Sequence, residues 1–419
     1  MSITHYPALV RIASDGNTVT IGGTSVDAFG RVRISAPMTL FDSSHRFTDN
    51  DLWVDSITGT ASATFSANEG LVNLAVGAAN GDQIVRETKK VFSYQPGKSL
   101  LIMSTFVLGA AKANLRQRVG YYGSNNGVYF ERDGTSLYFV ERSIVSGSVV
   151  NTSVAQTNWN QDKLDGTGPS GFTLDASKAQ ILYSDIEWLG IGTVRMGFII
   201  NGVFVPAHSF HHANFIDTTY ITTASLPLRY EMTNTAATAS ASTLKKICST
   251  VISEGGYELR GRQQAVANLV TSPTTLTTAG TSYPIISIRL KSTRLDGIVV
   301  LSAVSILGIT NNANYKWELV EAGTTTGGTW VSAGTNSCVE YNLTGSSFAI
   351  GNGNVLASGF FQGSNQGSTS IDVIKESLFK FQLERNSFTS TPFELTLVCT
   401  ASSNGDQLLA SLDWEEISR

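Results

Sequence analysis

The stretch GYYGSNNGVYFERDGTSLYFV (Gly120–Val140) and, further along the chain, VRMGFIINGVFV (Val194–Val205) decide the fold. Each consists of apolar and aromatic runs separated by Asn-Gly or Asp-Gly dipeptides. These dipeptides supply the positive φ angles that tight hairpin turns need, and the twist of such turns matches that of paired strands. Three such signals, at Asn126-Gly127, Asp133-Gly134 and Asn201-Gly202, predict an antiparallel sheet built from consecutive hairpins.

The composition is that of an ordered, β-rich protein with few charges. The 419 residues are 42% hydrophobic, which is enough for sizeable cores, and the length suggests two or three domains. Only 15% of the residues are charged, well below the roughly 25% of ordinary soluble domains. The net charge of −4 and the lack of a Lys/Arg run argue against nucleic acid and anionic membranes as partners.

Three cysteines, Cys248, Cys338 and Cys399, are widely spaced and lie in or beside apolar runs. We expect them to be small buried apolar residues, because a disulfide scaffold needs more cysteines and a zinc site needs close pairs. Met1–His5 has neither a positive nor an apolar targeting segment, and the longest apolar stretch, Ile298–Ile309, is too short to span a bilayer. The sequence therefore predicts synthesis in a cytoplasm without a signal peptide.

Changes in pattern divide the chain into four parts. Residues 1–44 form a short N-terminal β segment, which we expect to pack on the next domain or on a neighbouring chain because so few strands are not stable alone. Residues 45–258 form a hairpin-rich β-sandwich, residues 259–273 a linker, and residues 274–419 a second β-sandwich. The predicted fold class is all-β, with two antiparallel sandwich or jelly-roll-like domains after the N-terminal segment.

Two local predictions accompany this division. The N-terminal segment contains three candidate strands: Ala8–Ile12, Thr18–Ile21 and Arg31–Ile34. One short helix is expected at Asp175–Leu182, with Asp175 as its N-cap.

Gly166–Gly171 (GTGPSG) matches a dinucleotide-binding fingerprint letter for letter. That fingerprint must follow a buried strand and open a helix, whereas the preceding residues here are polar, so we predict a surface loop. Four side chains of the same region offer oxygen atoms: Asn158, Asn160, Asp162 and Asp165. Lys163 stands where a calcium loop of the EF-hand type requires glycine, so Asx-turns are favoured and bound calcium is the alternative.

His208, His211 and His212 are three of the five histidines. In a strand the first and last share one face, so the three cannot converge on one metal ion. We interpret them as polar surface residues, with a metal held by one histidine from each chain on a trimer axis as the alternative. Asp185 and Glu187 share a strand face as a glycosidase acid pair does, but a solvated face is the simpler interpretation.

No G-x-S-x-G, P-loop or H-E-x-x-H motif occurs in the chain. We therefore assign no catalytic residue, no cofactor-binding residue and no metal ligand. The sequence predicts a protein that is not an enzyme and that needs no cofactor.

Six stretches carry a resemblance to a known family: Val26–Ser35 (VDAFGRVRIS), Thr39–Phe47, Tyr94–Ser99, Trp159–Gly171, Trp188–Phe198 and Ile247–Gly256. In these stretches the chain resembles a family of virion structural proteins of tailed bacteriophages, marine and cyanobacterial phages especially. The resemblance covers about residues 1–256 and continues into the second domain. The family supplies no catalytic residues to carry over.

The resemblance implies a non-enzymatic virion structural protein, namely a tail fibre, spike or baseplate-associated component that presents a rigid β surface for assembly or host attachment. A capsid decoration or head-fibre protein is the alternative, and a glycan-degrading tail spike comes third. The implied partners are other copies in a homotrimer, other virion proteins through residues 1–44, and a host cell-surface glycan, with neither nucleic acid nor membrane. The chain is expected in the virion, assembled in the host cytoplasm.

Overall fold

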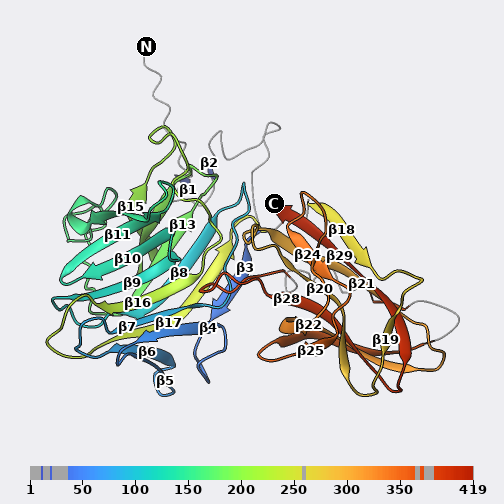
Figure 1. Ribbon diagram of the computed structural model, residues 1–419. Helices are drawn as coiled ribbons and strands as arrows, with labels where there is room; N and C mark the ends of the chain where they lie inside the picture. The colour runs from blue at the N-terminus through green and yellow to red at the C-terminus, as the bar shows by residue number, and fades with distance from the viewer. Residues whose placement is uncertain are drawn as a thin grey trace, which may run out of the picture.

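The computed structural model describes residues 11–12, 19–20, 36–256, 261–363, 369–371 and 382–418. These ranges form antiparallel strands and one 3-10 turn, η1 (Gln156–Asn158), and contain no α-helix. Apart from the pair β1 (Arg11–Ile12) and β2 (Val19–Thr20), the strands make four sheets, arranged as two sandwiches side by side (Figure 1). The all-β prediction is confirmed.

The first sandwich consists of two sheets, named here after central strands. The β9 sheet has the order β12-β11-β10-β9-β16-β7-β4. Its strands are β4 (Trp53–Thr58), β7 (Gln83–Thr88), β9 (Leu115–Tyr122), β10 (Gly127–Asp133), β11 (Ser136–Ser143), β12 (Val150–Ala155) and β16 (Leu228–Asn234).

The β8 sheet has the order β15-β14-β13-β8-β17-β6-β5, with β3 also paired to β17. Its strands are β3 (Met38–Ser43), β5 (Ser62–Ser66), β6 (Leu71–Val76), β8 (Leu100–Val107), β13 (Gln180–Ile186), β14 (Val194–Ile200), β15 (Val203–Phe210) and β17 (Ser242–Ser253). Residues 38–43 of the predicted N-terminal segment are thus part of the first sandwich. The strand predicted at Arg31–Ile34 lies outside the described residues.

All three predicted hairpins form. β9 pairs with β10, β10 with β11, and β14 with β15, each antiparallel. Asn201 and Gly202 have φ angles of 54° and 79°, so both central residues of the last turn adopt the left-handed conformation that its tight connection requires. Local turn chemistry therefore determines the pairing in this part of the chain.

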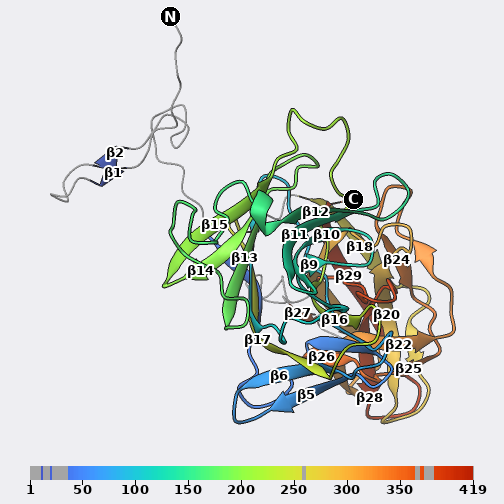
Figure 2. The same ribbon diagram turned by 90° about the vertical axis from the view of Figure 1, so that its left-hand side faces the viewer.

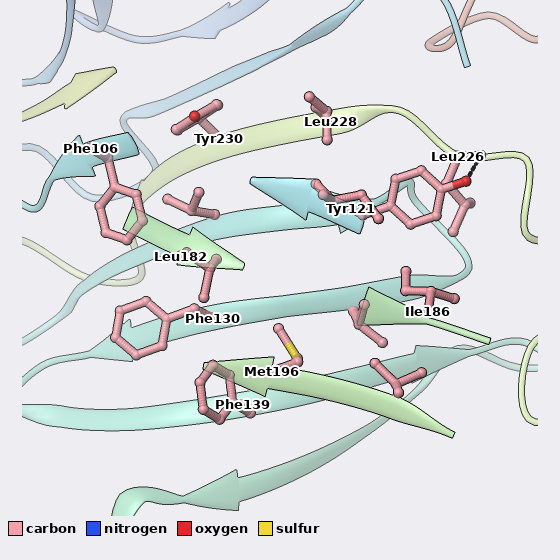
Figure 3. Packing of buried hydrophobic residues seen from close by; sticks show 14 of the residues in the cluster. Phe106, Tyr121, Phe130, Phe139, Leu182, Ile186, Met196, Leu226, Leu228 and Tyr230 are labelled. Atoms are coloured by element: carbon pink, nitrogen blue, oxygen red, sulfur yellow. Dashed lines mark hydrogen bonds between the residues drawn. The ribbon is translucent and has the colours of Figure 1, made fainter. Parts of the chain in front are cut away.

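The core of the first sandwich lies between its two sheets and is strongly aromatic (Figure 3). Phe130 of β10 lies edge-on to Phe198 of β14 with 5.3 Å between ring centroids, which joins the β9 sheet to the β8 sheet. Phe139 packs 5.7 Å from Phe130. At one end of the core the Tyr121 hydroxyl lies 2.5 Å from the carbonyl oxygen of Phe92 and accepts a hydrogen bond from the Leu226 N–H (3.2 Å). These hydrogen bonds satisfy the Tyr121 hydroxyl, which is otherwise surrounded by apolar side chains.

The second sandwich has its own core of residues between Val266 and Trp414. One sheet has the order β18-β29-β21-β27, with β19 beside β29, and consists of β18 (Arg262–Ala267), β19 (Thr274–Leu276), β21 (Ile298–Gly308), β27 (Thr369–Ile371) and β29 (Asp406–Ser418). The other has the order β23-β24-β20-β28-β22-β25, with β26 beside β22, and consists of β20 (Ser282–Leu290), β22 (Asn314–Thr326), β23 (Val331–Ser332), β24 (Val339–Asn342), β25 (Ser347–Ala349), β26 (Asn354–Gln362) and β28 (Glu394–Ala401).

Two predictions are corrected by these strands. The helix expected at Asp175–Leu182 does not form: the Asp175 carboxylate accepts hydrogen bonds from the backbone and hydroxyl of Ser177, and β13 begins at Gln180. Such an Asx-turn competes with a helix start because the same side chain caps either structure. The predicted linker contains β18, which pairs with β29. It looked like a loop because only Val266 of this strand is buried.

Polar contacts join the two sandwiches. The Lys90 ammonium lies 3.0 Å from the Glu384 carboxylate and 3.4 Å from that of Glu321. The Arg385 guanidinium donates to the Ser225 carbonyl oxygen (3.2 Å), and the Ser387 N–H donates to the Lys89 carbonyl oxygen (3.3 Å). These contacts at the junction are polar, unlike the two cores on either side of it.

Candidate functional site

Two adjoining hollows form a groove along the outer face of β13, β14 and β15. Figure 2 shows these three strands at one side of the first sandwich. The hollows have volumes of about 530 and 520 Å³ and share Asp185, Thr193 and Arg195. The first hollow extends toward Tyr94 and Lys98, and the second toward Phe204 and His211. We refer to both hollows together as the β13–β15 groove.

The strand register places the residues of this groove in line. Asp185 of β13 is the direct partner of Arg195 of β14, which in turn pairs with Ser209 of β15. Residues directly opposite on neighbouring antiparallel strands point to the same face. The middle of the groove is therefore a row of acid, base and hydroxyl held by three paired strands.

The Asp185 carboxylate and the Arg195 guanidinium form a salt bridge. The Asp185 side chain is only 14% exposed, whereas Arg195 is 60% exposed. Burial raises the pKa of Asp185, and the charge of Arg195 opposes that rise. The expectation of a simple solvated face at Asp185 and Glu187 is therefore wrong for Asp185, which lies in a hollow against a cation.

The second hollow has an aromatic wall. The Phe204 ring is 49% exposed and lies edge-on to Tyr183 with 5.0 Å between centroids. Gly197 makes this arrangement possible, because a Cβ there would lie 2.9 Å from the Tyr183 ring and 2.2 Å from the Val205 carbonyl oxygen. Burial of Tyr183 raises the pKa of its hydroxyl to about 12, so this ring is neutral at physiological pH.

The turn between β13 and β14 borders the first hollow. Leu189 and Gly190 have φ angles of 39° and 79°, and the Gly192 N–H donates to the Trp188 carbonyl oxygen (2.7 Å). This tight turn places Glu187 beside Thr193, whose N–H lies 3.5 Å from the Glu187 carboxylate. Glu187 thus lines the same hollow as Asp185.

The histidine cluster is divided between the interior and the groove. His208 and His212 are buried, so the interpretation of these two as surface residues is wrong, while His211 lines the second hollow. The Asn160 N–H donates to His208 Nδ1 (3.3 Å), and burial together with His211 lowers the pKa of His208 to about 4. Burial is tolerated because each buried imidazole has a hydrogen-bond partner.

His212 connects the groove turn to the β9 sheet. Its Nε2 lies 2.7 Å from the Glu141 carboxylate and its Nδ1 lies 2.5 Å from the Gly192 carbonyl oxygen. The ring stacks on Tyr220 with 4.0 Å between centroids. Burial opposes protonation, but the Glu141 carboxylate outweighs it and raises the pKa of His212. His212 therefore holds the turn in place.

The loop that contains Gly166–Gly171 is confirmed as a loop, and its carboxylates bind the chain itself. Asp162 accepts hydrogen bonds from the N–H groups of Leu164 (2.8 Å) and Ser170 (2.7 Å), and Asp165 accepts one from the Thr167 N–H (2.9 Å). Asn160 exchanges hydrogen bonds with the backbone of Ser209. Among the described residues no three His, Cys, Asp or Glu side chains are grouped so that they could hold a metal ion.

None of the three cysteines forms a disulfide. Cys338 and Cys399 are buried in the core of the second sandwich, as expected, whereas Cys248 is only half-buried. Burial raises the pKa of the Cys338 and Cys399 thiols. Neutral buried thiols are poor nucleophiles, so these two are packing residues.

A second charged cluster, missed in the sequence, lies on the β9 sheet. Arg118 donates to Glu131 (2.5 Å) and to Glu231 (3.2 Å), and its guanidinium lies 5.1 Å from the centre of the Tyr129 ring. Burial alone would raise the pKa of Glu231, but Arg118, Arg229 and Arg116 outweigh it and lower the pKa. Because Arg118, Glu131 and Glu231 at its centre are buried and bound to one another, we interpret the cluster as structural.

Comparison with protein-family models gives no match, and comparison with curated proteins gives none. Among solved structures, the chain is similar to a Bacillus licheniformis beta-glucanase, with 11% identity over 50% of this chain and 96% of the glucanase and a TM-score of 0.34. It is similar to a carbohydrate esterase from the Shiga toxin-encoding bacteriophage phi24B (14% identity, 52% and 100% covered, TM-score 0.32). It is also similar to the CBM2 module of the evolved Dit of Lactobacillus casei BL23 phage J-1 (4% identity, 54% and 100% covered, TM-score 0.33).

Within the described part of the chain, no helix has the length and apolar character needed to cross a membrane.

Proposed function

We propose that this chain is a non-enzymatic structural protein of a bacteriophage virion, a tail fibre, spike or baseplate-associated component. In this proposal the β13–β15 groove binds a glycan of the host surface. The β13–β15 groove carries the proposal, because paired antiparallel strands hold its central residues in a fixed register. Figure 2 shows these strands at one side of the first sandwich. A rigid site loses little conformational entropy on binding, which suits attachment.

The state of the two carboxylates supports binding rather than catalysis. A glycosidase needs one protonated and one ionised carboxyl group on opposite sides of the scissile bond. Here the Asp185 carboxylate is in a salt bridge with Arg195, and Glu187, directly after the end of β13, lines the same hollow. Two carboxylates two residues apart on the wall of one hollow do not lie on opposite sides of a bound sugar.

Electron cryo-microscopy of the phage particle tests the proposal. A copy number and position that follow tail or baseplate symmetry support it. Copies spread over the capsid lattice would favour a decoration protein instead, and absence from the particle would refute both. The three-fold assembly and the attachment of residues 1–44 to the virion are tested by the same map.

A second candidate, a glycan-degrading spike, follows from the presence of Asp185 and Glu187 in one hollow together with the raised pKa of Asp185. Incubation of polysaccharides with the purified chain decides between the two functions. We expect unchanged chain lengths by size-exclusion chromatography. Shortening by the wild type but not by Asp185→Asn would establish hydrolysis.

A further inference from the structure

We infer that the β13–β15 groove selects neutral oligosaccharides and rejects anionic ones such as uronic-acid polymers. This inference rests on the proposed glycan-binding function and specifies its ligand class. It depends on three features of the groove: its charge balance, its exposed aromatic wall and its length.

The acidic and basic side chains that line the groove are equal in number, and a further carboxylate lies nearby. Asp185 and Arg195 neutralise each other in a salt bridge, and the first hollow holds Glu187 as well as Lys98. Glu254, which accepts a hydrogen bond from the Ser99 hydroxyl (2.5 Å), adds a further carboxylate that acts on Asp185. A polyanion draws its affinity from arginine and lysine side chains that lack an acidic partner. In this groove, its carboxylates would instead approach fixed carboxylates.

A neutral sugar hydroxyl suits the same groups, because it both donates and accepts hydrogen bonds. The Asp185 carboxylate offers acceptors, and the Arg195 guanidinium, 60% exposed, offers donors beside it. Gln161, Thr193 and Ser209 add amide and hydroxyl groups along the same line. The middle of the groove can therefore bind vicinal hydroxyls without taking up net charge.

The wall of the second hollow suits the apolar face of a sugar ring. Phe204 is half-exposed and packs edge-on against the Tyr183 ring, and Pro206 lines the same hollow. An exposed aromatic ring beside polar groups binds ligands that have one apolar face and one polar edge. Each hollow, at about 530 and 520 Å³, lies within the usual range of ligand pockets, so the groove accommodates an oligosaccharide rather than a single sugar.

Isothermal titration calorimetry on the full chain tests the inference with cellohexaose, laminarihexaose and chitohexaose as neutral probes and hexagalacturonate as the anionic probe. We expect at least one neutral probe to bind about tenfold more tightly than hexagalacturonate, with an affinity that salt changes little. Equal or tighter binding of hexagalacturonate would overturn the inference, and so would the failure of all three neutral probes.

Two variants test whether binding occurs in this groove. Phe204→Ala is expected to weaken the neutral probe about tenfold, since it removes the exposed ring. Arg195→Gln, at an exposed position, replaces the guanidinium with its five N–H donors by a shorter, uncharged amide with two, and should weaken it similarly. Phe215→Ala is the matched control, because Phe215 is 76% exposed and does not line either hollow. Wild-type affinity in Phe204→Ala and Arg195→Gln would refute the site.

The two proposals fail independently. If the chain is found in the virion but no neutral probe binds, the ligand class is wrong and the structural role stands. If neutral probes bind in the groove but the chain is absent from the particle, the virion role is wrong and the ligand class stands.

Discussion

The junction between the sandwiches predicts a pH dependence of stability that one substitution removes. Glu384 and Glu321 share the single ammonium of Lys90 at 3.0 and 3.4 Å, and the Glu384 side chain is only 11% exposed. Burial raises the pKa of Glu384 to about 8, Lys90 opposes the rise, and Glu321 adds to it. The folded protein therefore keeps a proton on Glu384 at a pH where the unfolded chain has lost it.

The sign and size of the effect follow from this difference. An unfolded glutamate has a pKa of about 4.3, so the stabilising contribution is complete below that pH. It falls between about pH 4.3 and about pH 8, by about 1.4 kcal/mol per pH unit, because the unfolded state is the one that releases the proton. Between pH 5 and pH 8 the free energy of unfolding should therefore drop by about 4 kcal/mol through Glu384 alone.

Urea unfolding of the full chain across this pH range, for the wild type and Glu384→Gln, measures the effect. Glutamine keeps the length and an acceptor for Lys90 but does not titrate, so the variant should lose most of the slope. Asp51→Asn is the control: it also removes one negative charge, but its side chain is 85% exposed. Parallel pH profiles of wild type and Glu384→Gln would refute the reasoning, because other titrating groups contribute equally to both proteins.

Three further substitutions test the folding argument by the free energy of unfolding in urea. Phe130→Ala removes the ring that joins the two sheets and should cost about 3–5 kcal/mol; a loss below 1 kcal/mol would mean that this core is loosely packed. Glu231→Gln leaves the buried Arg118 without this carboxylate and should cost about 3 kcal/mol at pH 7. The folded state lowers the pKa of Glu231, so the stability difference between wild type and variant should vanish as the pH falls below that folded pKa. Gly197→Ala places a Cβ against the Val205 carbonyl oxygen and should cost about 1–3 kcal/mol. Gly123→Ala is the comparison, because a Cβ there would make only ordinary van der Waals contacts.

The parts of the fold that the sequence predicted are those that local turn chemistry controls. Asn201 and Gly202 fix the β14–β15 register, because a tight turn with positive φ angles at both central residues joins two strands in only one way. The predictions were wrong where one local sequence pattern is compatible with two structures. Asp175 begins an Asx-turn as readily as a helix, and a polar edge strand such as β18 has nearly the same composition as a linker.

The groove was beyond prediction for a different reason: its parts are distant in the chain. Asp185 was identified as a candidate, but its partner Arg195 follows only if the turn through Leu189-Gly190 is known to set the register. His212 holds that turn through Glu141, 71 residues earlier in the sequence, and no local pattern connects them. The pairing changes the chemistry as well as the position. An unpaired Asp185 beside Glu187 would suggest an acid for catalysis, whereas the salt bridge with Arg195 makes Asp185 one half of a neutral ion pair. In our proposal the oxygen atoms of this pair's carboxylate accept hydrogen bonds from sugar hydroxyls.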